Sequence, residues 1–100
     1  MKIQILEIEA TPEKGTFIVI VLVGEKQHKF TMNVESVTVA NQEVQVTNGD
    51  DNFLEVFRFN QIGASAICKL VNKIYNHQVV ELPACIGGEF DLENNKIASL

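Results

Sequence analysis

The chain has 100 residues, 46% of them hydrophobic, and a formal net charge of −5; these values describe one globular domain over residues 1–100. The negative charge argues against a nucleic-acid-binding protein that tracks phosphates. No apolar run approaches the roughly 20 residues of a membrane span, and Glu7 and Glu9 interrupt the segment where a secretion signal would be apolar.

The first 23 residues predict two strands joined by a turn. Apolar residues alternate in one phase at Ile3 and Ile5 and in the opposite phase from Leu6 onward, which predicts a β-bulge at that point. Residues 11–15 contain the proline and the glycine of a turn. The unbroken apolar run 17–23 is typical of a central strand that is buried on both faces.

A first hairpin is predicted between this strand and the next. A four-residue loop at 24–27 would place Val21 opposite Phe30, so that apolar side chains meet across the strands. The apolar alternation changes phase at 35–36, which predicts a bend or a bulge there.

A second hairpin and a further strand are predicted next. A turn around Asn41-Gln42 would pair Val37 with Val46, and Asn41 tolerates the left-handed conformation of a tight turn. The Asn-Gly-Asp-Asp sequence at 48–51 is the strongest turn signal in the chain. The run 53–59 contains three phenylalanines and a valine, which favour a strand over a helix.

Residues 61–77 predict an amphipathic helix. Its apolar residues recur at helical spacing on one side: Ala66, Ile67, Leu70, Val71, Ile74 and Tyr75. Asn60 is suited to capping the first turn, and we expect Leu70 to be buried against the sheet. After the helix, Val79 to Leu82 predict a short strand, and residues 89–100 an extended tail or a final strand.

Together these elements predict an α+β fold. We expect an antiparallel β-meander of five to seven strands, bent or partly rolled, covered by one amphipathic helix near residues 61–77. The runs 17–23 and 53–59 carry apolar side chains on both faces, and one helix covers only part of one face. We therefore expect a homodimer.

Few residues suit catalysis or metal binding, and none has a recognised spacing. Cys68 and Cys85 are too few for a disulfide scaffold, so we expect a protein of the reducing cytoplasm. The histidines, His28 and His77, form no zinc-binding pattern with them, so we expect no metal and no cofactor. The weak catalytic candidates are His77 and Cys85, with Gly87-Gly88 as an anion-binding loop; an ordinary turn explains the same glycines.

Residues 58–80 form a basic segment in an acidic chain, because they contain Arg58, Lys69 and Lys73 and no acid. Such residues usually form a solvated surface, but the contrast also fits docking to an acidic protein partner or a second subunit. These features favour a small cytoplasmic protein-interaction or regulatory module without catalysis. The alternative is a small enzyme or anion-binding protein that uses His77, Cys85 and the Gly87-Gly88 loop.

Overall fold

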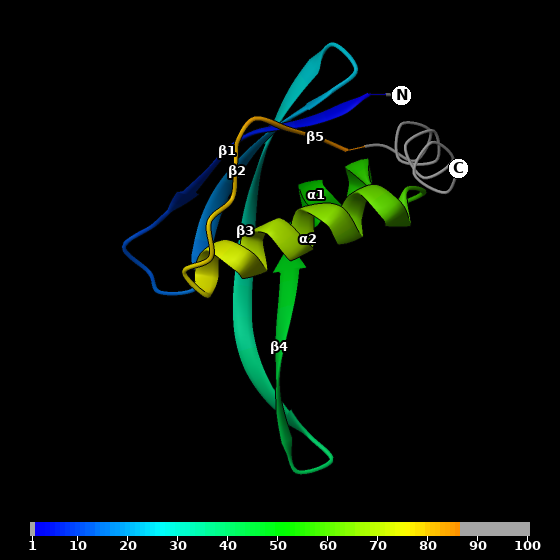
Figure 1. Ribbon diagram of the computed structural model, residues 1–100. Helices are drawn as coiled ribbons and strands as arrows, with labels where there is room; N and C mark the ends of the chain where they lie inside the picture. The colour runs from blue at the N-terminus through cyan, green and yellow to red at the C-terminus, as the bar shows by residue number, and fades with distance from the viewer. Residues whose placement is uncertain (1, 87–100) are drawn as a thin grey trace, which may run out of the picture.

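The computed structural model describes residues 2–86 as a curled antiparallel sheet with helices packed on one face (Figure 1). Its elements, in chain order, are β1 (Ile3–Ala10), β2 (Thr16–Val23), β3 (Lys26–Val39), β4 (Gln42–Gly49), α1 (Asp51–Val56), α2 (Gln61–Tyr75) and β5 (Ala84–Ile86). The strand order is β4-β3-β2-β1-β5. The predicted α+β fold and antiparallel meander are therefore confirmed, with β5 returning to pair with β1.

The core lies between the sheet and α2. Alternate residues of β2, namely Phe17, Val19 and Val21, are buried on the side of α2, because side chains alternate between the two faces of a strand. The intervening residues Ile18, Ile20 and Leu22 are only half-buried on the outer face. The prediction that this run is buried on both faces therefore holds for one face only.

Helix α2 begins as the sequence predicts and ends two residues early. The side-chain oxygen of Asn60 accepts a hydrogen bond of 2.9 Å from the Gly63 N–H, which satisfies a free donor of the first turn. The helix stops at Tyr75 because His77 has a left-handed backbone (φ 62°) and the Gln78 N–H turns back to the Lys73 carbonyl, at 2.8 Å.

The deepest residues of α2 are Ile67 and Val71, which are both 0% exposed. Leu70, expected to be buried, is only half-buried at the margin of the core. The two buried residues are four apart, one turn on the same side of the helix. Leu70 lies to one side of that line, so its contribution to the core is smaller than the sequence suggested.

The prediction of a strand over 53–59 is wrong, because the chain forms the short helix α1 there. Asp50 caps this helix, and its carboxylate accepts from the Phe53 N–H at 2.9 Å. Phe53 and Phe57 are four residues apart and both pack edge-on against Phe30 of β3. Phe59, expected on the same face, is 91% exposed.

The predicted bulge in β1 is confirmed, and both hairpin registers differ from the prediction. The β1–β2 register shifts between Ile5 and Glu7. Both hairpin turns have two residues, so Val21 lies opposite His28 and Val37 lies opposite Val44. Each register is displaced by two residues, which keeps every side chain on its expected face.

The predicted strand over 79–82 is also wrong. Val79 is 91% exposed, and the strand forms later, at Ala84–Ile86, where Ala84 lies opposite Ile5 on β1. This pairing places Ala84 and Ile86 beside buried residues of β1 and explains why β5 forms there. The expected tail at 89–100 and the Gly87-Gly88 loop lie outside the described residues.

Strand β3 is long because it serves two neighbours in succession. It pairs with β2 only as far as Asn33, opposite Thr16. From there to its end at Val39, its only neighbouring strand within residues 2–86 is β4. We call this outer part of the β3–β4 hairpin, residues 35–46, the arm; it extends away from the body of the molecule (Figure 1). Its register is unbroken, so of the bend or bulge predicted at 35–36 there is no bulge. Strand β3 instead curves along its length (Figure 1).

Candidate functional site

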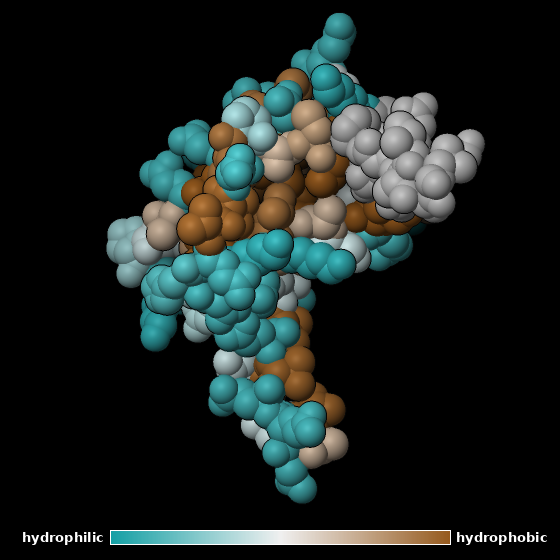
Figure 2. All heavy atoms as spheres, viewed as in Figure 1, coloured by the Kyte–Doolittle hydropathy of each residue, from teal (hydrophilic) through white to brown (hydrophobic). Residues whose placement is uncertain are grey.

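The arm exposes apolar side chains on the sheet face that points away from α2. Val37, Val39 and Val44 are 37%, 57% and 42% exposed. Val37 lies opposite Val44, and Val46 lies two residues further along the same face of β4. Apolar atoms are visible along one side of the arm in Figure 2. The arm thus presents apolar surface that the core does not use.

The tip of the arm is a tight two-residue turn. Ala40 and Asn41 have φ values of 51° and 66°, and strand pairing begins directly beside them with Val39 opposite Gln42. Two consecutive left-handed residues match the twist of the flanking strands. The arm is therefore a regular hairpin to its end, with its valines held in fixed positions.

A cluster of side-chain amides joins the base of the arm to α2. The side-chain oxygen of Gln45 accepts hydrogen bonds from the side-chain amides of Asn72, at 3.1 Å, and Asn76, at 2.8 Å. The Gln45 amide nitrogen donates to the Asn76 side-chain oxygen at 3.0 Å. Because Gln45 is on the opposite strand face from Val44, α2 contacts one face of the arm and leaves the valine face free.

The basic residues expected to bind a partner are on the surface but do not form one group. Arg58 lies before α2, with its guanidinium carbon 5.2 Å from the centre of the exposed Phe59 ring. Lys69 and Lys73 are exposed in the second half of α2, one turn apart. Lys73 directly follows Asn72 of the amide cluster, and Lys69 directly follows Cys68, which contacts Thr47 of β4. Both lysines are therefore on the part of α2 that borders β4.

The structure does not bring the catalytic candidates His77 and Cys85 together. Cys85 is exposed and lies opposite Gln4, at the start of β1. His77 lines a pocket with Ala10, at the other end of that strand. A strand rises about 3.3 Å per residue, so Gln4 and Ala10 are about 20 Å apart.

The second cysteine, Cys68, has a structural contact on β4. Its thiol donates to the Thr47 carbonyl at 3.7 Å, and its side chain is half-buried between α2 and β4. Burial raises the pKa of the Cys68 thiol, because the low dielectric disfavours the thiolate. Cys68 therefore has the environment of a packing residue and not of a nucleophile.

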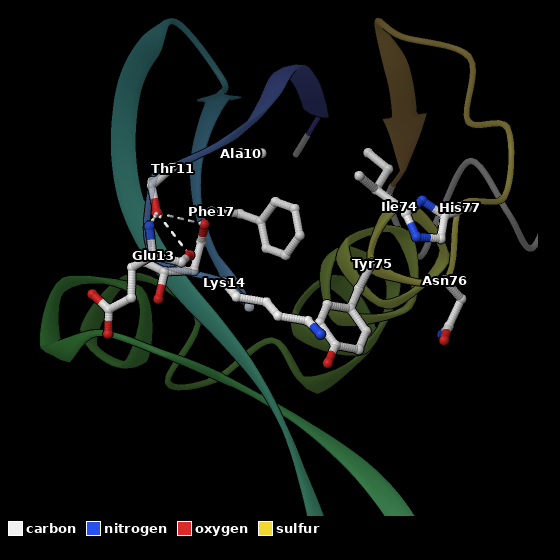
Figure 3. A pocket seen from close by; sticks show the side chains of 11 residues that line it. Ala10, Thr11, Glu13, Lys14, Phe17, Ile74, Tyr75, Asn76 and His77 are labelled. Atoms are coloured by element: carbon white, nitrogen blue, oxygen red, sulfur yellow. Dashed lines mark hydrogen bonds between the residues drawn. The ribbon is translucent and has the colours of Figure 1, made fainter.

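An open pocket of about 630 Å³ lies between the β1–β2 turn and the end of α2 (Figure 3). Its walls include Phe17 and Tyr75, whose rings meet edge-to-face at 6.5 Å. Lys14 extends toward Tyr75, while the Glu13 carboxylate points away from the cavity (Figure 3). The C-terminal end of α2 adds a partial negative charge near Lys14, so the lining of the pocket carries charges of both signs.

The arm was not predicted, although a pattern in the sequence of β3 marks it. Phe30, Met32 and Val34 alternate in one phase, and Val37 and Val39 alternate in the other. That change of phase marks where β3 leaves the core and turns its apolar residues to the opposite face.

Within residues 2–86, no three His, Cys, Asp or Glu side chains gather as metal ligands would. Neither helix in this range has the length and hydropathy that crossing a membrane requires. Comparison of the chain with protein-family models, curated proteins and solved structures finds no match.

Proposed function

We propose that this chain is a small, non-catalytic protein-interaction module that acts as a homodimer. The observation that carries the proposal is the arm, which holds three exposed valines in a regular hairpin outside the core. Apolar side chains at such a position add little to the stability of a monomer, and clustered exposed apolar residues are characteristic of interaction sites.

The outer face of β2 is a weaker candidate for the interaction surface. Its half-buried apolar residues form a single line along one strand. Ile20 lies between two charged residues, opposite Glu7 on β1 and Lys29 on β3. The carbon chains of such residues can cover an apolar neighbour while their charges stay in water. The valines of the arm have no such flanking charges on the outer side of β4, because β4 is an edge strand.

The charges and cysteines are consistent with this role. Lys69 and Lys73 provide a basic surface beside the arm, to which an acidic surface of a second subunit or partner protein can dock. Cys68 and Cys85 are both free, which supports a location in the reducing cytoplasm.

Sedimentation equilibrium at micromolar concentration tests the proposal. We expect the average mass to rise with concentration from the 11.1 kDa of one chain toward twice that value. The Val44→Asp variant should remain near the monomer mass, because it places a charge in the centre of the valine face. Circular dichroism should show that this variant keeps its fold, since Val44 lies outside the core.

Leu54→Asp is the matched control, because Leu54 is an exposed apolar residue, 60% accessible. It lies on α1, which packs on the sheet face opposite to the exposed valines. This variant should dimerise like the unmodified chain. A mass that stays at 11.1 kDa at every concentration, or equal weakening by both substitutions, would contradict the proposal.

A further inference from the structure

The open side of β4 lacks the features that normally protect an edge strand. In residues 2–86, β4 and β5 are the two edges of the sheet, and β4 is the longer, with eight residues against three. Its sequence contains no proline and no lysine, its only charge is Glu43, and its pairing with β3 has no bulge. Edges of this kind readily pair with another strand.

The hydrogen bond from Cys68 shows which backbone groups of β4 point to the open side. In an antiparallel ladder, alternate residues direct both N–H and C=O toward the same neighbour. The Thr47 carbonyl accepts from α2 and therefore does not point to β3. Glu43 and Gln45 alternate with Thr47 along β4, so their backbone N–H and C=O groups also face outward. The Thr47 carbonyl is already occupied, so Glu43 and Gln45 are the outward-facing residues of the arm that are free to pair.

We propose that two copies of the chain join their β4 strands antiparallel about a two-fold axis at Val44. The inference rests on the proposed function and specifies the surface by which the homodimer forms. Glu43 of each copy then lies opposite Gln45 of the other, and Val44 lies opposite Val44. The five strands of each copy continue into one sheet, with both copies of α2 on the same side, because the axis is perpendicular to the sheet.

The valines favour this register over its neighbours. Val37 lies opposite Val44 within one chain, so pairing Val44 with Val44 creates an unbroken row of four valines across four strands. A shift that placed Val44 opposite Val46 would end the row at Glu35, which is the partner of Val46 on β3. Apolar pairs directly opposite one another stabilise a sheet, and this register provides the most.

The charges fit the same arrangement. Glu43 and Gln45 share one strand face, and that is the face on which Gln45 contacts Asn72 and Asn76 of α2. The Glu43 carboxylate of one copy therefore approaches the other copy's α2 beside the amide cluster, where Lys69 and Lys73 are exposed. Each acidic residue meets a basic surface, and the two-fold axis forms this contact twice.

Disulfide cross-linking tests the register. Since Glu43 and Gln45 form the hydrogen-bonded pairs, Val44 faces its copy at a non-hydrogen-bonded site, where Cα atoms are about 4.5 Å apart and a disulfide can form. In a Cys85→Ser background, Val44→Cys should give a covalent dimer under mild oxidation. Val37→Cys should give none, because the two Val37 positions are three strand spacings apart, about 14 Å.

Exchange of charges provides the second test. Glu43→Lys should raise the dimer dissociation constant by roughly tenfold, since it places like charges at two symmetric contacts. Combining it with Lys69→Glu and Lys73→Glu should restore most of the affinity, whereas Lys29→Glu, on the outer face of β3, should not. Lys29 is exposed like the other two lysines, so it controls for the reversal of a lysine charge away from the contact.

The outcomes separate this inference from the proposed function. A dimer that forms but cross-links through Val46→Cys and not Val44→Cys, or through neither, would overturn the β4 register while leaving the interaction module in place. A chain that is monomeric in sedimentation would overturn both. Cross-linking at Val44 together with recovery by the reversed charges would support both.

Discussion

The inner and outer parts of β3 have similar sequences and opposite surroundings. Phe30, Met32 and Val34 in the inner part are 0%, 0% and 6% exposed, whereas Val37 and Val39 in the outer part are 37% and 57% exposed. Both parts alternate apolar with polar residues in the pattern of a strand. They differ in their neighbours, because the inner part has β2 beside it and the helices over it, while the outer part has β4 alone. Alternation therefore identifies a face of a strand without showing what covers it.

The core and the arm should differ most in their response to truncation. Ile67→Ala removes a fully buried side chain of α2 and should lower the free energy of unfolding by about 2–5 kcal/mol, through lost burial and a cavity. Val39→Ala in the arm should cost less than about 1 kcal/mol. Urea unfolding in the monomeric Val44→Asp background measures both without a contribution from dimer dissociation.

Two further substitutions calibrate this comparison. Leu70→Ala should fall between the two values, because Leu70 is half-buried. Lys73→Ala, at an exposed position of the same helix, should change the free energy by less than about 0.5 kcal/mol. Equal costs for Ile67→Ala and Val39→Ala would show that the arm belongs to the core.

Local signals in the sequence predicted the elements that depend on local chemistry. Asn60 identified the start of α2, and the change of phase after Ile5 identified the bulge in β1. Helix α1 was mistaken for a strand because phenylalanines favour strands in general, whereas here Asp50 caps a turn that packs Phe53 and Phe57 against Phe30. The aromatic contacts come from β3, a separate part of the chain, so tertiary packing decided the outcome.

The candidate site was less predictable than the fold. Charge alone singled out Lys69 and Lys73, but only the structure shows that Asn72, the neighbour of Lys73, joins α2 to the arm. The proximity of His77 to Cys85 could not be judged from their separation of eight residues, because it depends on which end of β1 each one approaches. Hairpin registers also depend on loop length, and a two-residue error keeps the apolar pattern intact.

Gly15 marks the boundary between the two parts of β3 and offers a second test. Its carbonyl accepts from the Val34 N–H at 2.8 Å, and its φ is +86°. A Cβ added to Gly15 would lie 2.7 Å from the Val34 carbonyl oxygen, so the backbone would have to move. Gly15→Ala should therefore lower the free energy of unfolding by roughly 2–3 kcal/mol, as the left-handed conformation and the close contact both oppose it.

Gly24→Ala is the matched control for Gly15→Ala. Gly24 also has a left-handed backbone, with φ of +62°, but nothing lies within 4 Å of an added Cβ. Its cost should be limited to the conformational penalty of about 1 kcal/mol. If both alanines cost the same in thermal or urea unfolding, close packing at the point where β3 leaves the core contributes nothing measurable.

The smallest effect is expected at the amide cluster that joins the arm to α2. Gln45→Ala removes hydrogen bonds to Asn72 and Asn76 and should lower the free energy of unfolding by about 0.5–1.5 kcal/mol. Gln42→Ala, at an exposed site on the same strand, should have an effect below about 0.5 kcal/mol. Hydrogen exchange in the monomeric Val44→Asp background gives the sharper measurement, because local opening is detected even where global stability changes little. Gln45→Ala should speed exchange in the arm and leave β2 unchanged; uniform acceleration would mean that the arm and the core unfold as one unit.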